Sequence, residues 1–333
     1  MLLSPALQAF AADLRTLPVL QARFTLRLCE AGTLPAYKGA LLRGGLGYAM
    51  QRVLCPRPCW AKAEACAVRT RCPYHRIFEA VPATGTEPLI NLHDAPRAFV
   101  LSPPDDLQTQ YSAGAALEFR LLLIGSGIDD LPHFILGFEQ LGRMGLGRFH
   151  TPVRLDQVEV LAPWQAVGTL VYADGQARAG TQMLPYVDLP HIMQRAHALP
   201  GRLHLKLLTP LHLKQHGQPL RVFSLPALIQ AIGRRASLLG QLYAQATEPF
   251  DYRHFIDQAH RVPVSNQRLR WDDWRRTSTR GEARHTMPMG GLVGSVILQQ
   301  VAPELRAMLL LGSLIHAGKG ATFGLGQIEV NTE

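Results

Sequence analysis

Apolar and polar positions alternate in several short segments of the first half of the chain, and these segments predict strands. Helical spacing of apolar residues predicts two helices, over residues 35–54 and 129–141. The four strands are expected at residues 19–28, 97–102, 116–125 and 153–161. The resulting order is strand, helix, strand, strand, helix, strand, which is typical of the ferredoxin-like fold.

The same pattern restarts in the second half, after a stretch that is expected to form a connection and a hairpin. The predicted strands lie at residues 202–213, 262–274, 292–300 and 327–330, and the predicted helices at 225–245, 249–259 and 302–315. We therefore expect an α+β protein with tandem ferredoxin-like (RRM-like) domains. The expected boundaries are 1–161 with a Cys-rich insertion at about 55–80, 162–201 for the connection, and 202–333 with a glycine-rich loop at 318–326.

Each half ends in a helix, a glycine loop and a strand, which indicates internal duplication, although chance similarity of two glycine loops is the alternative. Glycine lets the backbone approach a ligand, and successive N–H groups can bind an anion. A P-loop is excluded because Lys319 is followed by Gly320. Both loops follow a helix, so a dinucleotide fingerprint is also excluded. The alternative is a tight turn, which fits the first loop well.

The composition is basic, which indicates binding to a negatively charged partner. The net charge is +9, and only five of the 34 basic residues are Lys, the rest being Arg. Arg favours phosphate binding and base stacking, although a GC-rich genome would also encode many Arg residues. Apolar runs are too short for a membrane helix, and the N-terminus lacks the basic start of a secretory signal. We therefore expect a cytoplasmic protein.

Four of the five Cys residues are clustered. A tetrahedral zinc site would suit these four thiolates, although their spacing is irregular, and an iron–sulfur cluster is less favoured. Unligated thiols in a compact insertion are the alternative, and His75 is a spare ligand. Cys29 lies in a predicted strand and is expected in the core. The predicted metal ligands are Cys55, Cys59, Cys66 and Cys72.

Several segments resemble the CRISPR precursor-RNA-processing endoribonucleases of the repeat-associated (RAMP) superfamily. The most specific segment is LIHAGKGATFGLGQIEV, which resembles the glycine-rich signature of that family. LLTPLHLK, the pair Arg234 and Arg235, WDDWRRTSTR and MPMGGLVGSV follow the family order over residues 203–331. The likeness of the N-terminal half rests on YKGALLRGGLGYAM, the Cys cluster and CPYHRIFE.

The resemblance implies two ferredoxin-like domains, binding of CRISPR repeat RNA, and cleavage without a metal ion. In that chemistry the ribose 2′-OH attacks the neighbouring phosphate and leaves a cyclic phosphate, which requires a general base, a general acid and positive charge. Several family members carry a catalytic His on the first helix. The helix predicted at residues 35–54 has no His.

Candidate site residues follow from these patterns. His316, at the junction of helix and glycine loop, is the first catalytic candidate, with Tyr37 and His285 as alternatives. A His at a helix C-terminus that only binds carbonyls is the competing interpretation. The predicted RNA contacts are basic or loop residues: Lys319, Gly318, Gly320, Lys38, Arg43, Arg275, Arg276, Arg280, Arg234 and Arg235.

The sequence thus predicts an endoribonuclease that cuts precursor CRISPR RNA, with no cofactor for catalysis. A non-catalytic RNA-binding subunit of a CRISPR effector complex is the second hypothesis, since RNA can be bound without a general acid. A zinc-dependent nucleic-acid adaptor built on the Cys cluster is the third. CRISPR repeat RNA is the expected partner, other effector subunits are further candidates, and no membrane association is expected.

Overall fold

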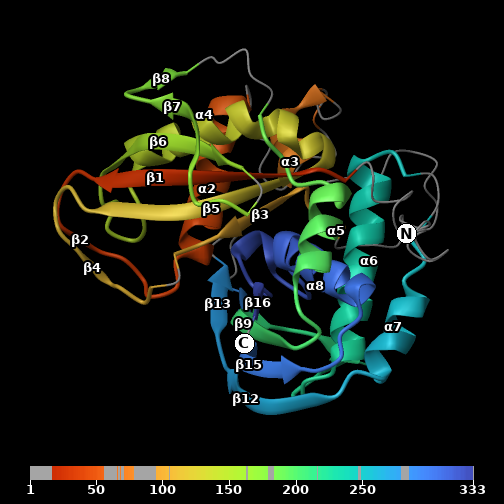
Figure 1. Ribbon diagram of the computed structural model, residues 1–333. Coiled ribbons are helices and arrows are strands. Elements are labelled where there is room, and N and C mark those ends of the chain that lie inside the picture. Colours follow the sequence, from red (N-terminus) through yellow and green to blue (C-terminus); the bar gives the residue numbers. More distant parts are fainter. Residues whose placement is uncertain are drawn as a thin grey trace. The chain divides into compact units, whose positions relative to one another are not determined.

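A computed structural model describes residues 17–55, 66, 68, 71–78, 95–104, 106–162, 164–178, 184–215, 217–246, 249–278 and 285–332. The chain divides into two compact units, the first spanning Val19–Val187 and the second containing the chain from Asp188 onward. Figure 1 shows the elements of both units in the colours of the sequence. In each unit, helices cover a sheet of antiparallel strands.

The first unit contains a six-stranded sheet in the order β3-β5-β1-β6-β7-β8. Its strands are β1 (Val19–Leu28), β3 (Phe99–Ser102), β5 (Ala116–Ile124), β6 (Val153–Leu161), β7 (Gly168–Ala173) and β8 (Gln176–Ala177), and β2 (Gly32–Thr33) pairs separately with β4 (Gln110–Tyr111). Its helices are α2 (Gly39–Leu54), α3 (Pro73–Phe78), the 3₁₀ helix η4 (Gly125–Asp130) and α4 (Leu131–Met144). The order of β3, β5, β1 and β6 is that of a ferredoxin-like domain.

Alternation in the strands creates the core of this unit. Phe24 on β1 is fully buried and packs on Phe119 of β5 and Phe138 of α4, with ring centroids 5.5 and 5.0 Å apart. Helix α2 contributes Leu42 and Leu46 to the same core. Burial of such large apolar side chains is the main favourable contribution to folding.

The second unit repeats this topology with a four-stranded sheet in the order β12-β15-β9-β16. Its strands are β9 (Leu203–Leu211), β12 (Val264–Asp272), β15 (Gly291–Leu298) and β16 (Ile328–Thr332), with the small pairs β10 (Lys214–Gln215) and β11 (Gln218–Pro219), and β13 (Arg275–Ser278) and β14 (His285–Pro288). Its helices are α5 (Leu189–Ala198), α6 (Leu225–Tyr243), α7 (Arg253–His260), α8 (Pro303–Ile315) and the 3₁₀ helix η5 (Ala321–Phe323). The tandem ferredoxin-like fold predicted from the pattern is confirmed.

Three local features differ from the expectation. Helix α5 was not predicted, and it is joined to α8 because Arg306 donates to the carbonyls of Ala196 and Leu199. The hairpin of β7 and β8 extends the first sheet, since β7 pairs with β6. The core position expected for Cys29 is wrong, because Cys29 follows the end of β1 and is exposed. Among the described helices, none is long and apolar enough to cross a membrane.

Candidate functional site

The second glycine loop (residues 316–326) is anchored to the end of β9 by its own backbone. The N–H of Lys319 donates to the carbonyl of His212 at 3.2 Å, and the N–H of Gly326 donates to that of Pro210 at 3.1 Å. The hydroxyl of Thr209 donates to the carbonyl of Gly324 at 2.8 Å. The N–H groups of Lys319 and Gly326 are therefore already bonded to protein carbonyls and do not point to a phosphate.

Two glycines make this close approach to β9 and within the loop feasible. A Cβ at Gly326, where φ is +68°, would lie 1.7 Å from the carbonyl oxygen of Ala317. A Cβ at Gly318, where φ is +74°, would lie 2.5 Å from the carbonyl oxygen of His212. Only glycine fits both the positive φ and the contact. The glycine pattern recognised in the sequence thus serves the folding of the loop itself.

His316 is buried beneath this loop. The whole residue is 1% exposed. Its Nδ1 donates to the carbonyl oxygen of Leu325 at 3.1 Å. Burial lowers the pKa of the imidazole to about 3, although the bond to Leu325 opposes this shift. The ring is therefore neutral at pH 7 and holds the loop closed, which matches the competing structural interpretation of this residue better than proton transfer to RNA.

The adjacent arginines on α6 have different environments. Arg234 is exposed. Arg235 is half-buried, and its Nε donates to the carbonyl of Ile315 at 2.8 Å, so it satisfies a carbonyl at the C-terminus of α8. Burial lowers the pKa of this guanidinium to about 10, which still leaves it charged at neutral pH. Of the predicted pair, only Arg234 presents its charge to solvent.

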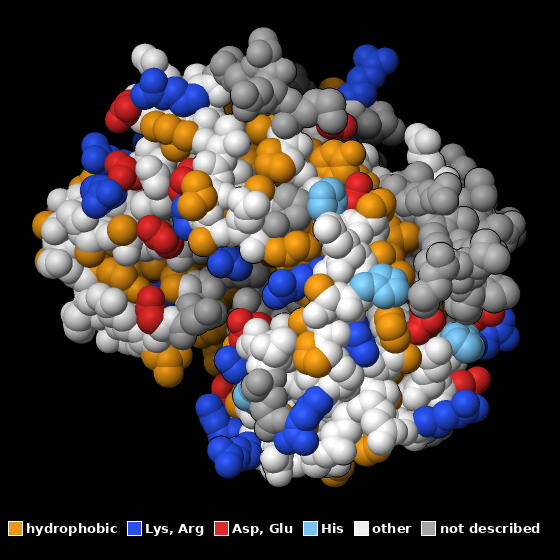
Figure 2. Space-filling model, viewed as in Figure 1, with side chains coloured by type: hydrophobic (Ala, Val, Ile, Leu, Met, Phe, Trp, Pro, Cys, Tyr) orange, Lys and Arg blue, Asp and Glu red, His pale blue; other side chains and the backbone are white. Residues whose placement is uncertain are grey.

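Exposed basic side chains lie on the second glycine loop and on the edge strand β12. Lys319 is exposed at the loop itself, and Arg268 and Arg270 are exposed on β12. The guanidinium of Arg221 lies over the ring of Trp271, 4.5 Å from the centroid. Figure 2 shows Lys and Arg side chains in the lower part of the view, where β12 lies. This arrangement of arginines with an aromatic ring suits a single-stranded polyanion.

His212 is a site residue that sequence reasoning missed. It is 6% exposed, and its Nδ1 donates to the carbonyl of Gly290 at 2.6 Å. Its Nε2 is buried and has no hydrogen-bond partner among the described residues. The ring lies 6.2 Å from that of Trp271. The LTPLHL pattern of a buried strand end was its only sequence signal.

The basic segment after β12 forms the hairpin of β13 and β14. Arg275 pairs with Pro288 and Arg276 with Met287, while His285 pairs with Ser278. The structure places these three residues by their backbone. Arg280 lies outside the described residues. The roles predicted for the side chains of this hairpin stay predictions.

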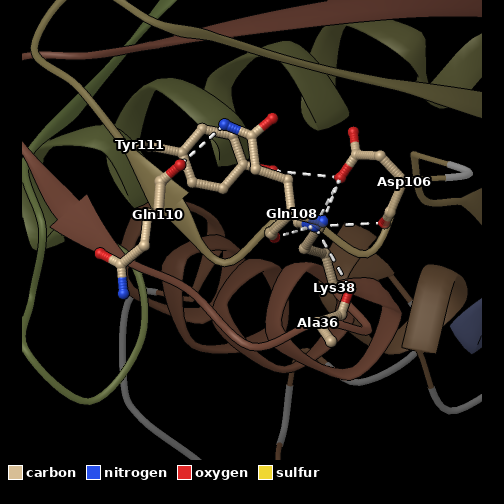
Figure 3. A network of polar contacts seen from close by, with 6 residues as sticks. All are labelled: Ala36, Lys38, Asp106, Gln108, Gln110 and Tyr111. Carbon is tan, nitrogen blue, oxygen red and sulfur yellow. Dashed lines mark hydrogen bonds and ion pairs between the residues drawn. The ribbon is translucent and has the colours of Figure 1, made fainter.

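Lys38, which was predicted to contact RNA, is fully buried in the first unit. Its ammonium donates to the Asp106 carboxylate at 2.8 Å, to the Gln108 carbonyl at 2.6 Å and to the Ala36 carbonyl at 3.2 Å, as Figure 3 shows. Tyr111 also donates to Asp106, at 3.4 Å. Burial opposes ionisation of Asp106, but the bonds from Lys38 and from the Gln108 N–H hold the pKa of this carboxyl below its usual value. Lys38 therefore ties the start of α2 to the segment before β4.

Tyr37 and Arg43 are also directed inward. Burial raises the pKa of the Tyr37 phenol, so this group stays protonated and cannot act as a base near neutral pH. The guanidinium of Arg43 lies 4.2 Å from the ring centroid of Phe78 and 5.7 Å from that of Phe99. Of the three polar residues predicted for an RNA site at the start of α2, Lys38 and Arg43 thus make contacts inside the first unit, and Tyr37 is half-buried.

The described part of the Cys cluster gives no support to a metal site. Cys55 and Cys72 are buried in the hydrophobic core and Cys66 is half-buried. Cys59 lies outside the described residues. Within the part of the chain that is described, no three His, Cys, Asp or Glu residues lie together in a way that could hold a metal ion.

Two family models cover most of the chain. Residues 17–184 match the AF_1859 N-terminal domain, and residues 205–328 match the CRISPR-associated endoribonuclease Cas6. A relative from Archaeoglobus fulgidus, described as an uncharacterized protein, is 23% identical over 305 residues, which cover 90% of this chain and 93% of the relative.

Solved structures share the fold. A Cas6 from Thermus thermophilus has a TM-score of 0.50 at 13% identity, with 95% of this chain and 99% of that chain covered. A chain of a partial Cas6-RT-Cas1–Cas2 complex has a TM-score of 0.56 at 12% identity, with 95% of this chain and 46% of that chain covered, so this chain spans less than half of its length. This chain belongs to the family of the AF_1859 N-terminal domain, whose model matches half of its length, and its second unit is similar to the CRISPR-associated endoribonuclease Cas6.

Proposed function

We propose that this protein binds CRISPR repeat RNA and cuts precursor CRISPR RNA without a metal ion. In the proposed step the ribose 2′-OH loses its proton and attacks the adjacent phosphorus. The bond to the 5′ oxygen of the next nucleotide breaks, and that oxygen takes up a proton. The products are a 2′,3′-cyclic phosphate and a 5′-OH end.

The observation that carries the proposal is the match of residues 205–328 to the Cas6 model. That range contains the second glycine loop with exposed Lys319, and it contains the exposed arginines Arg268 and Arg270. These cations can track an RNA backbone and offset charge on a phosphate.

The proton carriers are the open part of this proposal. With His316 bonded inside its unit and Tyr37 half-buried, His285 on β14 becomes the first residue to test. His212 is the second, because its Nε2, although buried, is an acceptor without a partner among the described residues. A group that transfers a proton in the transition state contributes roughly 10²–10⁴-fold to the rate.

A non-catalytic RNA-binding subunit is the second candidate function. The observation that favours it is the burial of His316, together with the absence of His from α2. Lys319 and the arginines of β12 would serve such a subunit equally well. Association with other CRISPR proteins belongs to this candidate, and the match to a chain of a Cas6-RT-Cas1–Cas2 complex supports testing it.

End-labelled repeat RNA incubated with the full chain in excess chelator separates the two candidates. The enzyme should cut the RNA and leave a cyclic phosphate, whereas a subunit that only binds should shift its mobility without cutting it. RNA with deoxyribose at the cut site should be bound and stay intact. Cleavage of that deoxy substrate would contradict the proposed mechanism. The cytoplasmic location expected from the sequence stays a prediction.

A further inference from the structure

The first glycine loop (residues 145–150) connects α4 to β6. Hydrogen bonds hold its tip, which consists of residues 148–150. Leu146 and Thr151 exchange two backbone hydrogen bonds, at 2.8 and 3.0 Å. The Nδ1 of His150 donates to the carbonyl of Met144 at 3.1 Å. A Cβ at Gly145 would lie 2.2 Å from the carbonyl oxygen of His150, so the turn closes on a glycine. The tip is a fixed turn with defined side-chain positions.

This tip exposes a full aromatic ring. Phe149 is 72% exposed, and the guanidinium of Arg148 lies 5.9 Å from its ring centroid. That distance is near the outer limit of a cation–π contact, so Arg148 does not cover the ring closely. Isolated exposed aliphatic residues are ordinary, but an exposed Phe on a rigid turn beside a cation is suited to stacking.

The charged side chains of the loop itself are all basic. Residues 143–150 contain Arg143 and Arg148 and no Asp or Glu, whereas Arg154 on β6 is paired with Asp156 at 3.0 Å. Arg148 forms no ion pair within the described part of the chain, and Arg143 is exposed at the end of α4. A polyanion therefore matches this surface better than an apolar or basic protein segment does.

We propose that Phe149 and Arg148 form a second RNA-binding site, which takes one unpaired nucleotide of the repeat RNA with its base stacked on Phe149 and a phosphate on Arg148. His150 is a positioning residue that holds the turn through Met144. The proposal rests on the RNA binding proposed above. It assigns a contact to the first unit, where the predicted RNA contact Lys38 is fully buried.

The site requires an unpaired nucleotide because a base in a duplex has its face covered by its neighbours. Stacking on an aromatic ring is tolerant of sequence, since every base has a π-face. The site therefore contributes affinity for single-stranded or looped repeat RNA and little preference among bases.

The test is the dissociation constant of the full chain for labelled repeat RNA. Phe149→Ala should weaken binding roughly fivefold or more, because base stacking on an aromatic side chain contributes at least about that factor. Phe149→Trp should keep wild-type affinity. Phe149→Leu should behave as Phe149→Ala, since it retains apolar bulk without a ring. Leu107→Ala is the matched control, because Leu107 is a 75% exposed apolar residue of the same unit, and it should bind as wild type.

2-Aminopurine placed at successive repeat positions locates the contact. Stacking should quench its fluorescence at one position in the wild type and release it in Phe149→Ala. Wild-type affinity in both Phe149→Ala and Phe149→Leu would overturn the proposal while leaving the proposed function standing. Wild-type affinity in Phe149→Leu alone would also overturn it, because the contact would then be apolar rather than stacking. Failure of the wild type to bind repeat RNA would remove the proposed function and this site with it.

Discussion

The first and second glycine loops hold the same place in their units, between the second helix and the last strand of the ferredoxin-like order. They nevertheless expose different kinds of side chain to solvent. The first exposes Phe149 beside Arg148 and keeps His150 bonded to the backbone. The second buries His316 and exposes Lys319. Their backbones differ as well, because the first loop is closed by the pair Leu146 and Thr151, whereas the second contains η5 and is bonded to the end of β9. Similarity of two glycine loops in sequence therefore leaves open both the form of the turn and which side chain faces RNA.

Each loop can be broken at one glycine whose Cα lies close to a backbone carbonyl. Gly326→Ala and Gly145→Ala should each lower the free energy of unfolding by about 3 kcal/mol or more, because the new Cβ would meet a carbonyl oxygen at 1.7 and 2.2 Å. Gly175→Ala is the control, since its φ is +75° but nothing lies within 4 Å of the Cβ, and it should cost about 1–2 kcal/mol. Urea unfolding measures all three. Equal effects at the three positions would show that φ alone matters.

Lys38 is a buried cation, in contrast to the exposed Lys319, and its replacement should affect stability rather than RNA binding. Lys38→Met should destabilise the protein by about 2–4 kcal/mol, because three backbone carbonyls and the Asp106 carboxylate would lose their donor. RNA affinity of the folded variant should not change. Unchanged stability with weakened RNA binding would return Lys38 to the role predicted from the sequence.

The burial of His316 gives the second loop a pH dependence. Its pKa of about 3 lies below the unfolded value of about 6.5, so the unfolded state binds the proton more tightly. The stability that this group contributes is complete above about pH 6.5 and is lost as the pH falls toward 3. Wild type should lose about 1.4 kcal/mol per pH unit in that window relative to His316→Gln. Parallel pH curves for the two proteins would contradict the burial.

Lys319 should have the smallest effect on folding and a measurable effect on binding. Lys319→Ala should leave the urea midpoint unchanged, because the side chain is exposed. It should reduce the slope of log affinity against log salt concentration by about 0.7, as expected for one lost phosphate contact to a single strand. Arg178→Ala, at an exposed arginine paired with Asp174, is the control and should retain the wild-type slope. An unchanged slope for Lys319→Ala would remove this residue from the site.

Periodicity predicted the sheets well and the site poorly, for a physical reason. β1 was predicted with its observed bounds because each alternate residue faces a continuous core. α5 escaped prediction because it is short and lies in a stretch punctuated by Pro and Gly. The burial of Lys38 depends on Asp106 and Gln108, about 70 residues away, and no local pattern records such a partner. His316 satisfied the pattern of a loop-side proton carrier, while its burial follows from the fold of the loop around it.

The position of β12 has a consequence for handling this protein. β12 is the outermost strand of the four-stranded sheet, so its free backbone groups could pair with another chain and seed aggregation. The exposed charges of Arg268 and Arg270, and the irregular register between Ser265 and Arg268, disfavour such pairing. The same arginines proposed to track RNA thus keep the edge soluble. Variants meant to abolish binding should replace them with Glu or Gln rather than with apolar residues, so that loss of affinity is not confused with precipitation.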